Sequence, residues 1–153
     1  NSYWILYNTE ILQLYDVQKR NKIYLPYAQV SYEGRDLFSV RNNNGNSGLI
    51  DASGRIILPL IYDYIRVEEE LNTIVAGSKN YYSLFYLNGN LKVFMNYPFS
   101  HLEPFKNGLS KVQQKQKSGF INKDGLLVIS TQYDSVRNFT NNRAAVCINA
   151  KWG

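Results

Sequence analysis

Two stretches of this chain, residues 47–63 and 118–134, repeat each other over 17 positions without a gap. In each stretch a Gly is followed six positions later by a second Gly, and eight positions after that by a Tyr-Asp pair. The first glycines are Gly48 and Gly119, and apolar residues fall at matching places after them. Self-similarity at a fixed offset is typical of repeat proteins. The chain is therefore predicted to be an array of one small structural unit.

The offset of 71 residues is twice a repeat of about 35, so a middle copy is expected near residue 83. Ser83 replaces the first Gly there, Gly89 is the second, and Tyr97 follows it by eight positions. We therefore expect an array over residues 27–153 after a divergent capping unit at residues 1–26. The expected units lie near residues 27–47, 48–82, 83–118 and 119–153.

Each unit is predicted to contain a β-hairpin. Gly54, Gly89 and Gly125 stand where a hairpin loop requires a positive φ. The Asp of the Tyr-Asp pair is expected to accept hydrogen bonds from backbone amides just ahead of it, as in an Asx turn. One hairpin is not stable alone, so the units must stack. The expected fold is all-β, with twisted hairpins in an open, solenoid-like array whose termini lie apart. The alternative is a small β-propeller, whose termini meet.

The repeated residues resemble those of the WG-repeat (WG beta-repeat) proteins of bacteria. The shared pattern is Gly-x-Ile-Asp-x-x-Gly, then Pro-x-x-Tyr-Asp, then Phe-x-x-Gly-Leu, then Lys-Trp-Gly, and it covers residues 27–153. The defining Trp-Gly remains only at Trp152-Gly153, and the proline only at Pro59. The resemblance implies an all-β repeat scaffold and no known reaction.

Composition and motifs argue against an enzyme. A single Cys and a single His exclude a disulfide framework and a Cys- or His-rich metal site, and no cofactor is expected. Cys147 is predicted to be a small core residue. Asp63 and Asp134 occupy equivalent places in two units, so a structural role explains both better than catalysis does. No apolar run is long enough for a membrane helix.

The N-terminal segment is expected to contain a strand at residues 3–7 and its partner at residues 10–17. Trp4 is predicted to cover the open end of the core. Because the chain begins at Asn1 and ends on Lys-Trp-Gly, we expect a piece of a longer bacterial protein, exported or held at the cell surface.

Charge is distributed unevenly along the chain. Residues 1–76 hold 7 Lys and Arg against 9 Asp and Glu, a net charge of −2, whereas residues 77–153 hold 10 against 3, a net charge of +7. A basic surface attracts acidic proteins or nucleic acid, although the excess can also serve solubility alone. We favour an acidic protein over nucleic acid as the partner. The acidic run Glu68-Glu69-Glu70 is expected to be a solvated loop.

Two groups of basic residues are the candidate contact sites. The first is a cluster of four lysines: Lys106, Lys111, Lys115 and Lys117. The second is a ladder of residues that each follow a corner tyrosine by four positions: Arg66, His101 and Arg137.

These features favour a non-catalytic scaffold that presents an extended surface to a protein partner, within a secreted or surface-attached assembly. The alternative is a carbohydrate-binding module with exposed aromatic rings as stacking platforms. The candidate platforms are Tyr81, Tyr82 and Trp4.

Overall fold

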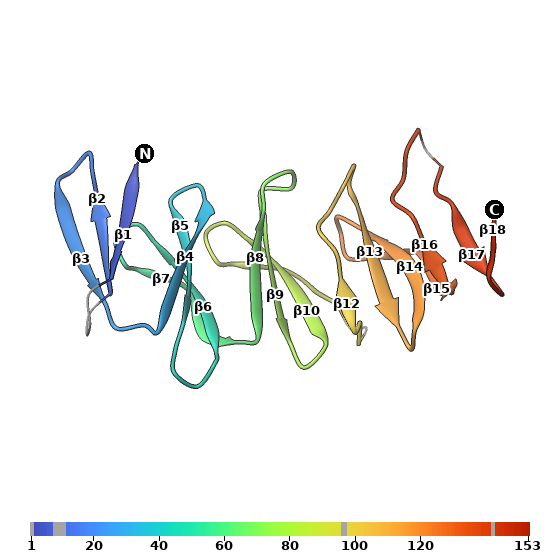
Figure 1. Ribbon diagram of the computed structural model, residues 1–153, viewed down its shortest axis with the longest axis horizontal. Helices are drawn as coiled ribbons and strands as arrows, with labels where there is room; N and C mark the ends of the chain where they lie inside the picture. Colours follow the sequence, from blue (N-terminus) through green and yellow to red (C-terminus); the bar gives the residue numbers. More distant parts are fainter. Residues whose placement is uncertain (1, 8–11, 96–97, 142) are drawn as a thin grey trace.

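A computed structural model describes residues 2–7, 12–95, 98–141 and 143–153, and these residues form five antiparallel sheets and no helix. Figure 1 shows the sheets in a row along the chain. The first sheet contains β1 (Tyr3–Tyr7), β2 (Leu12–Asp16) and β3 (Asn21–Leu25). The second contains β4 (Gln29–Gly34), β5 (Leu37–Arg41), β6 (Ser47–Asp51) and β7 (Ile56–Tyr62).

The later sheets repeat this order. The third contains β8 (Tyr64–Glu68), β9 (Thr73–Ser78), β10 (Tyr81–Tyr86) and β11 (Leu91–Met95). The fourth contains β12 (His101–Leu102), β13 (Leu109–Gln114), β14 (Lys117–Asn122) and β15 (Leu127–Tyr133). The fifth contains β16 (Ser135–Val136), β17 (Val146–Ile148) and β18 (Lys151–Trp152).

Every sheet is an up-and-down meander in which each strand pairs with the next one along the chain. A four-strand sheet is therefore the repeated unit, and its first strand begins at residue 29, 64, 101 and 135 in successive sheets. The expected unit that begins at Gly48 starts on β6, the third strand of a sheet. The repeat predicted from the sequence therefore has the length of one sheet, but its boundaries fall within the sheets rather than between them.

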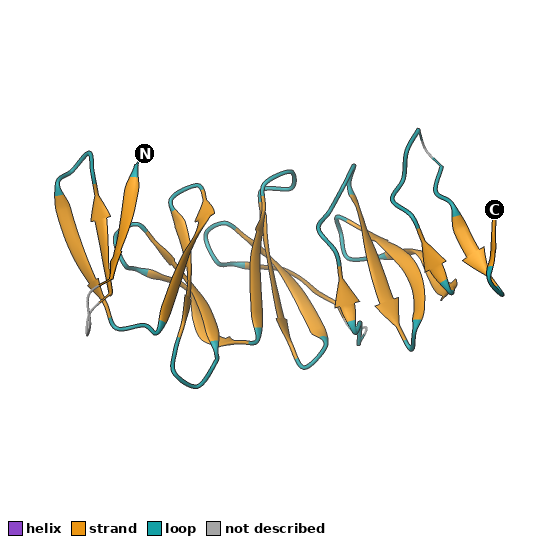
Figure 2. Cartoon of the chain, viewed as in Figure 1, coloured by secondary structure: helices purple, strands orange, loops and turns teal. Residues whose placement is uncertain are grey.

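The chain forms an open row of stacked sheets, with its N- and C-termini at opposite ends (Figure 1). Figure 2 shows that strands and connecting loops make up the described part of the array. The core lies between the sheets. One apolar cluster joins the first and second sheets around Phe38, another joins the second and third around Ile74, and another joins the third and fourth around Phe99. Each inner sheet therefore buries side chains on both of its faces.

The hairpin glycines adopt the predicted conformation. The φ angles of Gly54, Gly89 and Gly125 are +83°, +87° and +72°. These turns also touch the preceding sheet: a Cβ on Gly89 would lie 2.3 Å from the carbonyl oxygen of Ile57 on β7. The glycines are therefore required both for the turn and for stacking.

Gly48 and Gly119 have a different role, because the fourth strand crosses them closely. A Cβ on Gly119 would lie 2.3 Å from the carbonyl oxygen of Ile129 on β15. The pairing register shifts at both glycines but continues at Ser83, the corresponding residue of the third sheet. As a result, Met95 occupies the position that Tyr62 and Tyr133 hold in the neighbouring sheets. Tyr97, predicted for that position, lies outside the described residues.

Strands β1 and β2 pair as the sequence predicts, although residues 8–11 lie outside the described part of the chain. The prediction for Trp4 is wrong, because its side chain is 59% exposed and lies beside Tyr15 rather than over the core. Cys147 is buried, as expected. The described residues form no helix that could span a membrane.

Candidate interaction surfaces

The predicted basic ladder is interrupted in the structure. When the sheets are aligned by their strand pairing, Arg66 and Arg137 are equivalent to Glu103 of the fourth sheet. His101 is instead equivalent to Tyr64 of the third sheet and Ser135 of the fifth. The reason is the length of the preceding segment. Eleven positions separate Gly89 from Ser100, but nine separate Gly54 from Asp63, the equivalent pair of residues. Because of these two additional residues, His101 lies on β12 two positions before the residue that is equivalent to Arg66 and Arg137.

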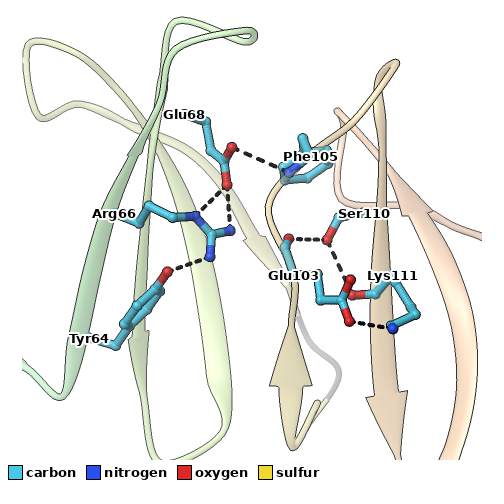
Figure 3. A network of polar contacts seen from close by, with 7 residues as sticks. All are labelled: Tyr64, Arg66, Glu68, Glu103, Phe105, Ser110 and Lys111. Carbon is cyan, nitrogen blue, oxygen red and sulfur yellow. Dashed lines mark hydrogen bonds and ion pairs between the residues drawn. The ribbon is translucent and has the colours of Figure 1, made fainter. Parts of the chain in front are cut away.

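Arg66 is held inside the junction between the third and fourth sheets (Figure 3). Its guanidinium forms an ion pair with Glu68 and donates a hydrogen bond to the hydroxyl of Tyr64. The Arg66 side chain is 20% exposed and that of Glu68 is 6% exposed. Arg66 therefore stabilises the stack, and only a small part of its side chain can reach a partner.

The prediction of a solvated loop is correct for Glu69 and Glu70, which are exposed in the turn after β8, and wrong for Glu68, which is buried at the end of β8. The run also links three consecutive sheets. The buried Glu68 accepts a hydrogen bond from the backbone N–H of Phe105 at 3.3 Å, and Glu70 accepts one from Gly108 at 2.9 Å. On the other side, the carbonyl oxygen of Glu69 accepts a hydrogen bond from Arg35 of the second sheet. The three carboxylates do not share one dry site, because only Glu68 is buried.

The remaining ladder residues are exposed. His101 begins β12 at the edge of the fourth sheet. Arg137 follows β16, and its guanidinium lies 5.0 Å from the ring centre of Trp152, a distance typical of a cation–π contact.

The four lysines do not form one patch. Lys111 is paired with Glu103 and Lys117 with Asp134 (Figure 3 shows the first pair). Lys106 and Lys115 are exposed, but they lie in the turns at opposite ends of β13. Among the described residues, only these two lysines of the cluster have no ion pair.

The corner aspartates accept backbone hydrogen bonds, but from a different segment than predicted. Asp63 accepts from the N–H of Lys79 at 2.9 Å, and Asp134 accepts from the N–H of Asn149 at 2.6 Å. Both donors lie in the turn between the second and third strands, where Lys79 has a φ of +50°. The hydrogen bond from Lys117, with that from Asn149, lowers the pKa of Asp134 below its usual value. These contacts fix the turn between the second and third strands.

Two of the three candidate sugar platforms are exposed. Trp4 and Tyr81 reach the surface, and the Tyr81 ring stacks on Phe94 with 6.3 Å between ring centres. Tyr82 instead packs into the core between the third and fourth sheets, over the backbone of Gly77.

The sequence reasoning missed an apolar row on the fourth strands. Tyr24, Ile61 and Phe94 hold the same position in β3, β7 and β11, as their pairing registers show. Their side chains are 65%, 60% and 56% exposed. We call these three residues the outer row. The sequence does not show directly that these three residues are equivalent. Their alignment depends on the register shifts at Gly48 and on the absence of such shifts at Ser83.

Comparison with known proteins identifies the repeat. The family described as WG containing repeat matches residues 48–71 and 119–152. No curated protein matches the sequence.

Solved structures share the fold at low sequence identity. The computationally designed Ika8 protein is similar with a TM-score of 0.52 and 10% identity, over 93% of this chain and 54% of that one. BamB from Moraxella catarrhalis is similar with a TM-score of 0.50 and 9% identity, over 90% of this chain and 48% of that one. The chain thus spans about half the length of these structures, and the likeness concerns the fold alone.

Proposed function

Because this chain is a WG-repeat protein, we propose that it is a non-catalytic scaffold that binds a protein partner along the outer row. The inner sheets bury both faces against their neighbours, so a partner reaches them only at strand edges and turns. The fourth strands form one such edge.

The observation that carries the proposal is the exposure of three large apolar side chains at one repeated position. Single exposed apolar residues are common on protein surfaces, but an aligned series is typical of interaction sites. Stacked sheets lie about 10 Å apart, so the outer row extends over roughly 20 Å. Aromatic residues such as Tyr24 and Phe94 are enriched among the anchors of protein interfaces.

Charge beside the row indicates the partner's chemistry. Lys22 precedes Tyr24 by two positions on β3, and Lys92 precedes Phe94 by two positions on β11. Residues two apart on a strand point to the same side. The apolar outer row therefore has basic groups beside it, which suits a partner surface with apolar and acidic side chains. The net charge of +5 would assist the approach of such a partner.

The test is affinity capture from the native source with the wild-type chain and with the variant Tyr24→Ser, Ile61→Ser, Phe94→Ser. We expect the wild-type chain to capture a protein that the variant does not capture. Purified wild-type chain should then bind that protein at least tenfold more tightly than the variant does. The matched control is Val128→Ser, which removes an exposed apolar side chain from β15 outside the row. Equal binding of the captured protein by wild type and the row variant would contradict the proposal.

A further inference from the structure

The second sheet differs at one turn from the three sheets that follow it. Six positions separate the paired residues Arg41 and Ser47, whereas five separate the equivalent pairs of the three later sheets, Gly77 and Tyr82, Gln113 and Ser118, and Cys147 and Trp152. The turn around Asn42–Asn46 is therefore one residue longer than the short turns of the third, fourth and fifth sheets. Those short turns are Lys79-Asn80, Lys115-Gln116 and Asn149-Ala150. In repeat proteins, insertions confined to one unit map to loops and are often part of a binding face.

A cavity of about 190 Å³ lies on one side of this loop, between the second and third sheets. Polar residues of the second sheet form most of its lining: Gln29, Ser31, Ser39, Arg41 and Ser47. Cross-strand pairing aligns Gln29 with Tyr64, Ser31 with Arg66, and Ser47 with Tyr82.

The cavity therefore results from substitution within the repeat. At these three positions the third sheet has two tyrosines and an arginine, and the second sheet has smaller side chains, while Arg41 stands where the third sheet has Gly77. Ser47 stands at the position of Trp152 in the fifth sheet, which is the Trp of the Trp-Gly pair.

A second cavity, of about 630 Å³, lies on the other side of the loop, between the first and second sheets. One part of its lining is apolar, with Leu25, Pro26 and Tyr27, and another part consists of Asn42, Asn43 and Asn44. The side chain of Asn42 is used within the loop, where its Oδ1 accepts hydrogen bonds from the N–H groups of Asn44 and Asn46. Asn43 and Asn44 are exposed.

We propose that these two cavities bind a short oligosaccharide that passes over the Asn42–Asn46 loop. Serine hydroxyls and the amides of Gln and Asn each both donate and accept hydrogen bonds, which matches the hydroxyl groups of a sugar. The apolar wall around Tyr27 matches the C–H face of a sugar ring. The smaller cavity holds the volume of about six water molecules, comparable to one sugar residue.

The chemistry of the lining argues against other ligand classes. Arg41 is the sole charged residue that lines either cavity in the described part of the chain. Its Nε and Nη2 already donate to Ser47 and to the carbonyl oxygen of Asp63, at 3.3 and 3.4 Å. One held guanidinium does not provide the several phosphate contacts that nucleic acids require. The inference goes beyond the protein contact proposed above, because it uses one turn and its cavities rather than the outer row.

The experiment is to apply the purified chain to an array of neutral and acidic oligosaccharides, and to titrate the glycan with the highest signal by calorimetry. Ser47→Trp fills the smaller cavity with the residue that the fold already carries at position 152. The double variant Asn43→Ala, Asn44→Ala removes two amides from the larger cavity. Each is expected to weaken binding at least tenfold without changing the melting temperature by more than a few degrees.

The matched control is Asn90→Ala, which removes an exposed Asn from another turn and is expected to bind as the wild type does. Should Ser47→Trp not fold, Ser47→Tyr copies the residue of the third sheet and serves the same test. No glycan binding by the wild type, or binding that Ser47→Trp and the double variant leave unchanged, overturns the inference.

Discussion

The carboxylate of Glu68 accepts a hydrogen bond from the backbone N–H of Phe105, 37 positions further along the chain and on the next sheet. The same carboxylate is paired with Arg66 on its own strand. One buried side chain thus pairs with a partly buried cation and links two units of the array. Stacking in this protein therefore depends on polar groups at the junctions as well as on the apolar clusters.

We expect Glu68→Ala to destabilise the chain by about 3 to 5 kcal/mol, because it leaves the charge of Arg66 without its partner in a largely buried site. Equilibrium unfolding in urea measures this effect. The control is Glu70→Ala, which removes one exposed hydrogen bond to Gly108 and should cost about 1 kcal/mol or less. Equal losses in the two variants would show that Glu68 does not have the role assigned to it.

Substitutions at two glycines with positive φ distinguish the cost of backbone strain from the cost of a lost stacking contact between sheets. A Cβ on Gly45, with a φ of +82°, meets nothing within 4 Å, whereas a Cβ on Gly89 meets backbone of the preceding sheet. Gly45→Ala should cost about 1 kcal/mol from backbone strain alone. Gly89→Ala should cost clearly more, roughly 3 kcal/mol, because the sheets must also move apart. Similar unfolding midpoints for both variants would be evidence against this stacking contact.

The period of the repeat, the hairpin glycines and the all-β fold could be predicted, because each depends on residues close together in the sequence. Gly54, Gly89 and Gly125 illustrate this, since a turn is a local structure. The position of His101 was predicted wrongly, because the two additional residues before it are recognised only once Ser100 is seen to pair with Gln113 as Asp63 pairs with Gly77. The burial of Glu68 depends on the N–H of Phe105, which no local pattern indicates. The outer row was missed because it depends on the register shift at Gly48 and on its absence at Ser83.

The stability of the fold should depend on the ionisation of Asp134 in acid. Hydrogen bonds from Lys117 and Asn149 lower its pKa in the folded state. The ionised form therefore adds stability above the unfolded-state pKa of about 3.9, and this stability is lost as the pH falls through the lower folded-state pKa. In melts between about pH 2 and 5, Asp134→Asn should show a smaller fall in melting temperature than the wild type. A parallel fall in both proteins would argue against this linkage.

The charge of the C-terminal half predicts faster association with an acidic partner at low salt. Because Lys106 and Lys115 are exposed, Lys106→Glu with Lys115→Glu should slow association while preserving the melting temperature. Lys117→Glu should instead lower the melting temperature, because it places a carboxylate beside Asp134. Stopped-flow association rates at about 0.05 and 0.5 M salt, with thermal melts, distinguish the two effects. An unchanged rate in the double variant would exclude electrostatic steering by these lysines.

The central claim is that a protein partner contacts the outer row. Hydrogen–deuterium exchange of the chain, alone and saturated with the partner captured from the native source, tests it most directly. The account predicts that slower exchange on binding concentrates in β3, β7 and β11, the strands that carry Tyr24, Ile61 and Phe94. Protection confined to the first strands β4, β8 and β12, with the fourth strands unchanged, would contradict it.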